Sequence, residues 1–536
     1  MTDLDIVDGL ISAKLTPKEA VDLGLSSNTL EVSVPCSRRN ILMLEAIAGV
    51  GSATDRYRIA RAQVMDTPRE QLAWIPEVLR GRGYDPSSLL QHQLQFINLA
   101  SQRSSLFNAS EQGTCKTLSA LAAALVCDRK RVLVVCPKMV ADEWMTEISG
   151  SNGRLPPVPI RVIPAFSGAT VRRELTGDGV ALVNYEALGA LEKKILAWKP
   201  DQVICDESWR LKNRTAKVTR VMTRVCRDRP VWLLGGTPVG NNVGDLWSQL
   251  RLLGQLKDSP YWRFVERYAR VQNIYLGRRT VHKIIGLQRV AELIGLLEPV
   301  WFRATKASCL DLPPKLPPER VRVSLTHRQQ EWYDHITQFG ETALAPLSLA
   351  GENTTLLRQQ QVVGGHLPLP EGIHELPCSK LDWLLGFTDS HLAGDPTVRM
   401  IVWCRFNDEI KRIGRGLREV LGESAVVEVY SDVGGLSAET KQLYNSKDPD
   451  GPQVIVAQIA MMSSGQNLQG TDINVYFSNS WIYIHLSQSE DRSHRQGRVG
   501  AVRYIDLVAT GTIDEQIIRA LDAKQDLSFR LTPSTA

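Results

Sequence analysis

The chain has 536 residues, of which 43% are hydrophobic and 23% are charged. This balance is typical of a globular protein and excludes a disordered, collagenous or fibrous chain, and the length predicts about three or four structural units. Lys and Arg total 63 and Asp and Glu total 58, so the formal net charge is +5. A histone-like polycation is therefore excluded, and any surface that binds phosphates has to come from local clustering of basic residues.

The nine cysteines show no CxxC spacing, which excludes a zinc ribbon and a thioredoxin-like motif. Several lie in apolar runs such as 134–136, where a reduced thiol acts as a small buried hydrophobe, so we expect a reducing compartment. The first residues, MTDLDIVDGL, lack the basic start and apolar core of a secretory signal. No apolar run approaches the roughly 18 residues of a membrane span. We expect neither a zinc site nor a membrane partner.

Residues 1–84 are predicted to form a small α/β accessory region. Leu30–Val34 alternates in the manner of a strand, and 41–48 and 69–80 have the spacing of amphipathic helices. No motif in this region points to a chemical function.

Residues 85–310 are predicted to form a first lobe, because short apolar β-rich runs alternate with helical segments. Strands separated by helical crossovers predict a parallel sheet covered on both faces. The runs are 131–138, 180–185, 202–207 and 231–236. The end of this region, 255–310, is aromatic and basic, and we expect helices there that project from the lobe.

Residues 311–376 are predicted to form a connector with a helical protrusion, because the Pro pairs of LPPKLPPERV interrupt helices and suit an extended chain. Residues 377–530 are predicted to form a second lobe, since the strand rhythm returns. Its runs are 400–406, 425–431, 453–459, 472–480 and 502–508. The expected fold class is α/β, with two parallel-sheet lobes in tandem.

The segment SEQGTCKTLSALAAAL, from Ser110, has the composition of a phosphate-binding loop. Such a loop needs a tight turn, a Lys for the β- and γ-phosphates and a hydroxyl for Mg²⁺ at a helix N-terminus, and Gly113, Lys116 and Thr117 supply these groups. Ser110 and Cys115 stand where the pattern GxxxxGK[ST] has glycines. The alternative is an ordinary strand-to-helix turn that contains Lys-Thr.

The segment QVICDESWRLKN is an apolar run that ends in two acids. At the tip of a strand, Asp206 can coordinate Mg²⁺ and Glu207 can polarise a water. A solvated acidic loop is the alternative, but the loop at Lys116 and this acidic pair are more specific together than either is alone.

Two arginines and a glutamine recur at helical spacing in QSEDRSHRQGR. If the segment is helical, Gln488, Arg492 and Arg495 share one face, and two guanidiniums can stabilise the charge on a transferring phosphoryl group. A solvated basic helix face is the alternative.

These segments, in this order, resemble the motifs of the Swi/Snf-type ATPases of helicase superfamily two. The resemblance spans about residues 85–525. It includes LLQHQLQFINLA, RVLVVCPKMVADEWMTEI, VNYEAL, DESWRLKN, GGTPVGNNVGDLWSQLRLL, RATKASCLDLPPK, SSGQNLQGTDINVYFSNSW, QSEDRSHRQGR and GTIDEQI.

The resemblance implies two RecA-like lobes, ATP and Mg²⁺ as cofactors, and double-stranded DNA as the partner, bound without sequence specificity. Gln93 would read adenine, and Gly113, Cys115, Lys116 and Thr117 would form the phosphate loop. Thr117 and Asp206 would hold Mg²⁺, and Glu207 would orient the attacking water. Gln488, Arg492 and Arg495 would act from the second lobe when the lobes close. The DNA backbone would be contacted by Lys138, Arg210, Lys212 and Asn213.

Four residues depart from the family pattern. Cys115 adds a Cβ where the loop approaches phosphate, and Trp209 replaces a histidine by an indole that donates one hydrogen bond and accepts none. Gln466 and Asn467 stand in a motif usually richer in Gly and Leu. We expect the Cys115 thiol to react quickly and to be protected by Mg-ATP, and a shielded packing role is the alternative.

Three functions are compatible with the sequence. The first is an ATP-dependent motor that moves on duplex DNA. The second is a branch-migrating, annealing or strand-separating helicase of replication or repair, with forked or branched DNA as partner, for which a wedge hairpin would be the discriminating element. The third is a degenerate motor that only binds DNA or a partner. We expect a cytoplasmic location in a bacterial or phage-infected cell, and a nuclear one only if the source is eukaryotic.

Overall fold

The computed structural model divides the chain into two compact units, Met1–Leu310 with Lys524–Ala536, and Asp311–Ala523. The structure describes residues 4–7, 10–14, 31–35, 72–150, 162–165, 175–240, 242–256, 259–276, 279–310, 312–313, 315–339, 352–369, 371–462, 467–495, 498 and 500–531.

The N-terminal region contains a three-stranded antiparallel sheet of β1 (Leu4–Val7), β2 (Leu10–Lys14) and β3 (Glu31–Pro35). The strand expected at 30–34 is therefore present, displaced by one residue. The helix expected at 41–48 lies outside the described residues. The helix expected at 69–80 is α4 (Trp74–Gly81), and its Ile75 and Leu79 are buried in the core of the first unit.

A seven-stranded sheet forms the centre of the first unit, in the order β12-β4-β9-β8-β5-β7-β6, with every paired neighbour parallel. All four strands expected from the sequence are present. The strands are β4 (Leu106–Asn108), β5 (Arg131–Cys136), β6 (Val162–Ala165), β7 (Gly179–Asn184), β8 (Gln202–Cys205), β9 (Val231–Leu234) and β12 (Trp301–Phe302).

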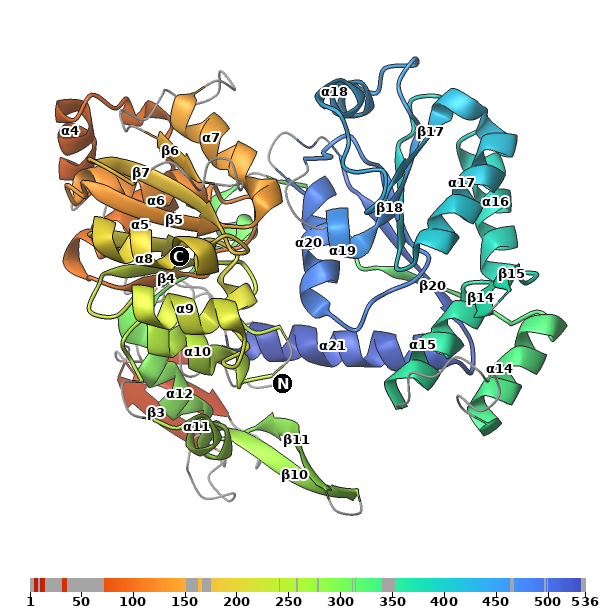
Figure 1. The fold of residues 1–536 in the computed structure, drawn as a ribbon, viewed down its shortest axis with the longest axis horizontal. Coiled ribbons are helices and arrows are strands. Elements are labelled where there is room, and N and C mark those ends of the chain that lie inside the picture. Colours follow the sequence, from red (N-terminus) through yellow and green to blue (C-terminus); the bar gives the residue numbers. More distant parts are fainter. Residues whose placement is uncertain are drawn as a thin grey trace. The chain divides into compact units, whose positions relative to one another are not determined.

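Helices cover both faces of this sheet, as its continuous apolar strands require. Along β5, Val132 and Val134 face one core and Leu133 and Val135 face the other, because successive side chains of a strand point to opposite faces. Figure 1 shows the two helical layers. The helices are α4, α5 (Gln91–Gln102), α6 (Lys116–Val126) and α7 (Ala141–Ser149) on one face, and α8 (Leu188–Trp198), α9 (Lys217–Val225), α10 (Asp245–Leu252), α11 (Tyr261–Tyr268) and α12 (Val290–Leu297) on the other.

The segment 255–310 is not purely helical, which corrects the expectation. Between α11 and α12 the chain forms an antiparallel hairpin of β10 (Ala269–Leu276) and β11 (Arg279–Leu287), which makes a sheet of its own. The run VQNIY is rich in β-formers, so strand propensity was present in the sequence. The first of the two segments that make up this unit, Met1–Leu310, ends with the short helix α13 (Lys306–Cys309).

The second unit contains a six-stranded sheet in the order β13-β20-β19-β16-β18-β17, parallel throughout. All five strands expected from the sequence are present. In addition, β13 is an edge strand at the end of the Pro-rich stretch that was expected to be only a connector. The strands are β13 (Glu319–Val323), β16 (Met400–Cys404), β17 (Val426–Val429), β18 (Val454–Gln458), β19 (Ile473–Tyr476) and β20 (Arg503–Ala509).

The helices of the second unit again cover two faces and add a third cluster. One face carries α16 (Ser379–His391) and α17 (Asn407–Leu421), and the other carries α18 (Ala438–Ser446), α19 (Ile459–Met462) and α20 (Tyr483–Ser493). The third cluster joins α14 (His327–Phe339), α15 (Glu352–Val363), the hairpin β14 (His366–Leu369) and β15 (Gly372–Glu375), and the start of α21 (Ile513–Leu531).

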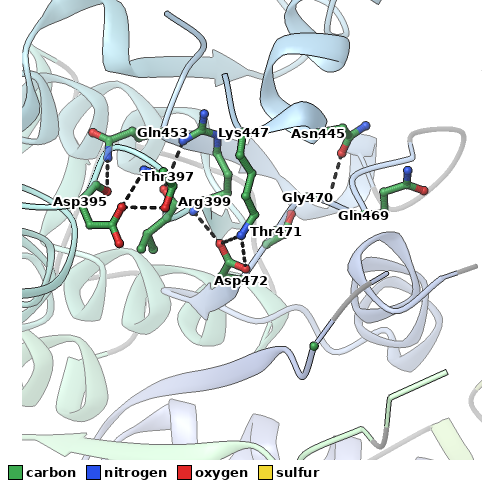
Figure 2. Close-up of polar contacts among 12 residues, drawn as sticks. Asp395, Thr397, Arg399, Asn445, Lys447, Gln453, Gln469, Gly470, Thr471 and Asp472 are labelled. Atoms are coloured by element: carbon green, nitrogen blue, oxygen red, sulfur yellow. Dashed lines mark hydrogen bonds and ion pairs between the residues drawn. The ribbon is translucent and has the colours of Figure 1, made fainter. Parts of the chain in front are cut away.

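A polar cluster fixes the amino ends of β16 and β19, as Figure 2 shows. The Asp472 carboxylate accepts hydrogen bonds from the backbone N–H of Arg399 at 3.0 Å and from Lys447 at 2.7 Å. It also accepts a hydrogen bond from Arg498 at 2.9 Å. The fully buried Arg399 donates to the carbonyls of Pro396 and Asp448. The Asp472 carboxylate is thus matched by two cations, and two carbonyls partly satisfy the Arg399 guanidinium, whose Nε is left without a hydrogen-bond partner among the described residues.

Within the described part of the chain, the helices lack the combination of length and apolar character that crossing a bilayer requires. The same residues bring together no group of three or more His, Cys, Asp or Glu side chains that could hold a metal ion.

Candidate nucleotide site

The predicted phosphate loop connects the end of β4 to the first turn of α6. Gly113 and Cys115 both have positive φ, +82° and +54°, and Cys115 is the residue just before the helix. Glycine adopts this conformation at no steric cost, whereas for cysteine it is strained. The Lys116 ammonium donates to the carbonyls of Ser110 and Glu111, each at 3.0 Å, and therefore lies inside the curve of the loop.

Ser110 has a structural role at the position where the pattern has a glycine. Its hydroxyl accepts a hydrogen bond from the backbone N–H of Ala304 at 2.9 Å. The neighbouring Glu111 carboxylate accepts one from the backbone N–H of Lys306 at 2.8 Å. The segment after β12 therefore holds the phosphate loop in place.

The helix α5 supports the loop from below through two adjacent side chains. Gln93 is buried; its Nε2 donates to the carbonyl of Cys115 at 3.3 Å, and its Oε1 accepts from the backbone N–H of Leu90 at 2.7 Å. His92 bonds the carbonyl of Thr114 at 2.9 Å, and burial lowers the pKa of this histidine, so it is neutral at pH 7. Gln93 is thus placed to hold the loop, and its reading of adenine stays a prediction.

The two predicted acids lie at the end of β8, and β9 separates β8 from β4 in the sheet. Asp206 is buried; its carboxylate accepts hydrogen bonds from the indole N–H of Trp144 at 2.8 Å and from the backbone N–H of Glu207 at 2.9 Å. Burial raises the pKa of Asp206, while the Trp144 hydrogen bond and the Lys116 charge oppose that rise.

Glu207 is held by two side-chain donors. The Trp209 indole donates to its Oε2 at 2.9 Å, and the Gln112 amide donates to its Oε1 at 3.2 Å. The backbone of Glu207 has φ +49°, a conformation that non-glycine residues adopt mainly where the surroundings impose it, often at functional sites. The indole that replaces the family's histidine therefore supplies a hydrogen bond to the candidate base.

The Gly-Thr-Pro segment after β9 packs against the phosphate loop. A Cβ at Gly236 would lie 3.1 Å from the backbone nitrogen of Gln112, so a larger residue would push the two segments apart by a few tenths of an ångström. Gln249 of α10 couples the Gly-Thr-Pro segment to the acidic segment: it accepts a hydrogen bond from Ser208 at 2.9 Å and donates to the carbonyl of Pro238 at 2.8 Å. Sequence reasoning missed the roles of Gln112, Trp144 and Gln249, although all three lie in segments that it recognised.

The residues expected to contact DNA follow the acidic pair or the end of the neighbouring strand β5. Lys138 is exposed just after β5. Arg210 and Lys212 each place their charge over the Trp209 ring, 5.7 Å from its centroid, and Arg210 also pairs with Glu186 at 3.3 Å. The Asn213 carboxamide oxygen closes a turn by accepting from Thr215, so this side chain is used locally.

The second unit brings two of its three predicted residues together. Gln488 and Arg492 lie one turn apart on α20, both buried, and the Arg492 Nε donates to the carbonyl of Gln488 at 3.2 Å. The helix ends at Ser493, so Arg495 lies beyond it and does not share the helical face that the spacing suggested. Gln466 lies outside the described residues, and Asn467 accepts a hydrogen bond from Asn445 through its carbonyl.

Comparison with known proteins decides the family. Residues 54–364, more than half of the chain, match the family described as the SNF2-related domain. The chain belongs to this family. Its membership confirms the resemblance to Swi/Snf-type, helicase-like ATPases, and the two parallel sheets confirm the predicted α/β fold class.

Individual relatives carry more specific names. The mouse DNA annealing helicase and endonuclease ZRANB3 is 26% identical over 478 residues, which cover 85% of this chain and 41% of that protein. The Zorya protein ZorD of Escherichia coli O139:H28 is 23% identical over 482 residues, which cover 81% and 41%. This SNF2-family chain thus spans about two fifths of the length of these curated relatives.

A solved structure also matches the chain. The Sulfolobus solfataricus SWI2/SNF2 ATPase core in complex with dsDNA aligns over 82% of this chain and 92% of that one, with 22% identity and a TM-score of 0.36.

Proposed function

We propose that this chain is an ATP-dependent motor that moves on double-stranded DNA without sequence specificity. One observation carries the proposal: in a chain of the SNF2-related family, the phosphate loop, the acidic pair and the Gly-Thr-Pro segment gather at the carboxyl ends of β4, β8 and β9. In parallel α/β sheets this edge is where ligands bind.

The residues have distinct roles in the proposed mechanism. Lys116 leaves the loop carbonyls to neutralise the β- and γ-phosphates of ATP. Glu207, oriented by Trp209 and Gln112, positions the attacking water and takes its proton. The oxygen donors of Thr117 and Asp206 suit Mg²⁺, which would supply charge neutralisation at the phosphates when bound.

Hydrolysis is proposed to need the second unit as well, through Arg492 and Arg495. The degenerate-motor alternative is disfavoured, because the loop lysine, both acids and both arginines are all present. An annealing or branch-migrating activity is the second candidate, and it is supported by the similarity to the mouse DNA annealing helicase and endonuclease ZRANB3.

The test is ATP hydrolysis by the full chain with no nucleic acid, single-stranded DNA, linear duplex, forked duplex and RNA. We expect duplex DNA to stimulate turnover most, and Glu207→Gln to bind ATP and duplex but to hydrolyse at least about a hundredfold more slowly. Stronger stimulation by RNA than by duplex DNA would contradict the proposal. A Glu207→Gln chain with wild-type turnover would contradict the role of the acid.

A further inference from the structure

The hairpin β10–β11 is a projecting element that the nucleotide site does not use. Its base is anchored, because Ala269 and Leu287 are buried and Val271 and Ile284 pack against the core of the first unit. Its strands are eight and nine residues long, roughly 25–30 Å, and Figure 1 shows them extending past α11. Among the described residues it pairs with no other strand.

The charge of the hairpin has one sign. Residues 269–287 contain four arginines and lysines and neither Asp nor Glu, whereas acidic and basic residues are nearly balanced in the whole chain. Near the base, Glu292 is paired with Arg267 at 2.5 Å, so this acid does not neutralise the hairpin. A one-sided cluster of this kind on a narrow projection attracts a polyanion.

Two large apolar side chains are exposed beside this charge. The pairing of β10 with β11 contains a bulge: Arg270 pairs with Gly286 and Val271 pairs with Ile284, so Ile285 is left as the extra residue. The side chain of Ile285 is 57% exposed. A bulge of this kind re-aims a side chain away from the regular pleat. On α11, Trp262 is 41% exposed, and its ring lies 4.8 Å from that of His282 on β11.

We propose that this hairpin engages the branch point of forked or four-way DNA, with its basic residues on phosphates and with Trp262 and Ile285 against unstacked bases. Intact duplex presents phosphates but no free base faces, so an exposed tryptophan and isoleucine gain contact only where the stack is interrupted. The inference rests on the proposed motor function, and it specifies branched DNA as the substrate of that motor. The hairpin is the wedge-like element that the sequence did not reveal.

Equilibrium binding tests the inference apart from ATP hydrolysis. Fluorescence anisotropy would give the Kd of the full chain for a fork, a four-way junction, a linear duplex of equal length and a stem-loop RNA. Two variants are compared with wild type: Trp262→Ala, and the double change Arg279→Ala with Lys283→Ala. Trp74→Ala, which alters another exposed tryptophan of the same unit, is the matched control.

We expect each hairpin variant to bind the fork and the junction about tenfold more weakly, with less than a twofold change on linear duplex. The double variant should also show a shallower dependence of fork affinity on salt, because fewer counterions are released. The double variant leaves Trp262 and Ile285 unchanged, so it tests the inference separately from Trp262→Ala, whose folding a thermal melt would check.

Three outcomes would overturn the inference. If the variants lost affinity equally for linear duplex and fork, the hairpin would be a general duplex contact. If affinity for every DNA were unchanged, the hairpin would bind a protein partner instead. If affinity for the stem-loop RNA fell more than affinity for DNA, the hairpin would bind RNA. A wild-type ATPase that no DNA stimulates would contradict the proposed motor instead, and the fork preference measured by binding would still decide the role of the hairpin.

Discussion

At the scale of single residues, the left-handed backbone at Cys115 has a measurable consequence. Its Cβ is strained at φ +54° and borders the phosphate loop. We predict that Cys115→Gly lowers the KM for ATP about two- to fivefold and leaves kcat equal or higher, because the loop regains a permissive residue. Cys115→Ala, which keeps the Cβ and removes only the thiol, should match wild type in steady-state kinetics. An alanine variant that behaved like the glycine variant would show that the thiol, and not the Cβ, matters.

A second prediction at this scale concerns Trp209. Its indole N–H donates to Glu207 at 2.9 Å, and its ring lies beneath the charges of Arg210 and Lys212. Trp209→Phe keeps a ring and removes the donor, so we expect kcat to fall about tenfold with little change in the KM for ATP, as a lost hydrogen bond to a charged group predicts.

Trp209→His restores a donor at the same position and should recover most of the activity. Steady-state ATPase assays on the two variants check this pair. If Trp209→Phe hydrolysed ATP as fast as wild type, the indole would be a packing residue and not a positioning one.

At the scale of elements, the start of α17 contains a buried acid that makes the second unit sensitive to pH. Burial raises the pKa of Glu409 from its ordinary 4.5 to about 7, and hydrogen bonds such as that from Ser478 only partly oppose this. The native state therefore holds the proton more tightly than the unfolded chain. The resulting stability is fully present below about pH 4.5 and is lost as pH rises through 7.

The side chain of Glu409→Gln cannot ionise. Between pH 5 and pH 8 the unfolding free energy of wild type should therefore fall more than that of the variant, and the difference should be on the order of 2 kcal/mol. Amide hydrogen exchange along β16 as a function of pH measures this. Some pH dependence should remain in the variant, because burial also raises the pKa of Asp506 to about 6. Glu419→Gln, on an exposed face of the same helix, is the control, and identical pH profiles for wild type and Glu409→Gln would refute the assignment.

At the scale of the whole molecule, the proposed motor makes hydrolysis depend on both units. Arg495→Ala should lower DNA-stimulated kcat by at least about a hundredfold, because an arginine near a transferring phosphoryl group typically contributes 10³- to 10⁵-fold. Affinities for ATP and duplex DNA, measured by equilibrium titration, should change by less than about threefold. Arg328→Ala, an exposed arginine of the same unit, is the control. Wild-type turnover in Arg495→Ala would remove the second unit from the chemistry.

The sequence by itself determined the fold class, the principal strands of both sheets and the main candidate residues of the nucleotide site. Buried parallel strands produce apolar runs that local pattern reveals, and a phosphate loop needs particular residue types within a few positions. The local sequence pattern also pointed to Asp206 and Glu207 as candidate acids. The residue type alone showed that the Trp209 indole can donate a hydrogen bond but cannot accept one.

Only the tertiary structure decided which groups meet across long stretches of chain. Trp144 reaches Asp206, Gln249 joins Ser208 to Pro238, and the segment after β12 anchors the phosphate loop, because parallel sheets bring distant strand ends together. The hairpin at 269–287 was mistaken for helix, since its Val-, Ile- and Tyr-rich strands lie between two helices and only cross-strand pairing fixes their conformation. The local pattern of apolar residues indicates which side chains are buried. The order of the strands in each sheet determines which residues far apart in the sequence come into contact.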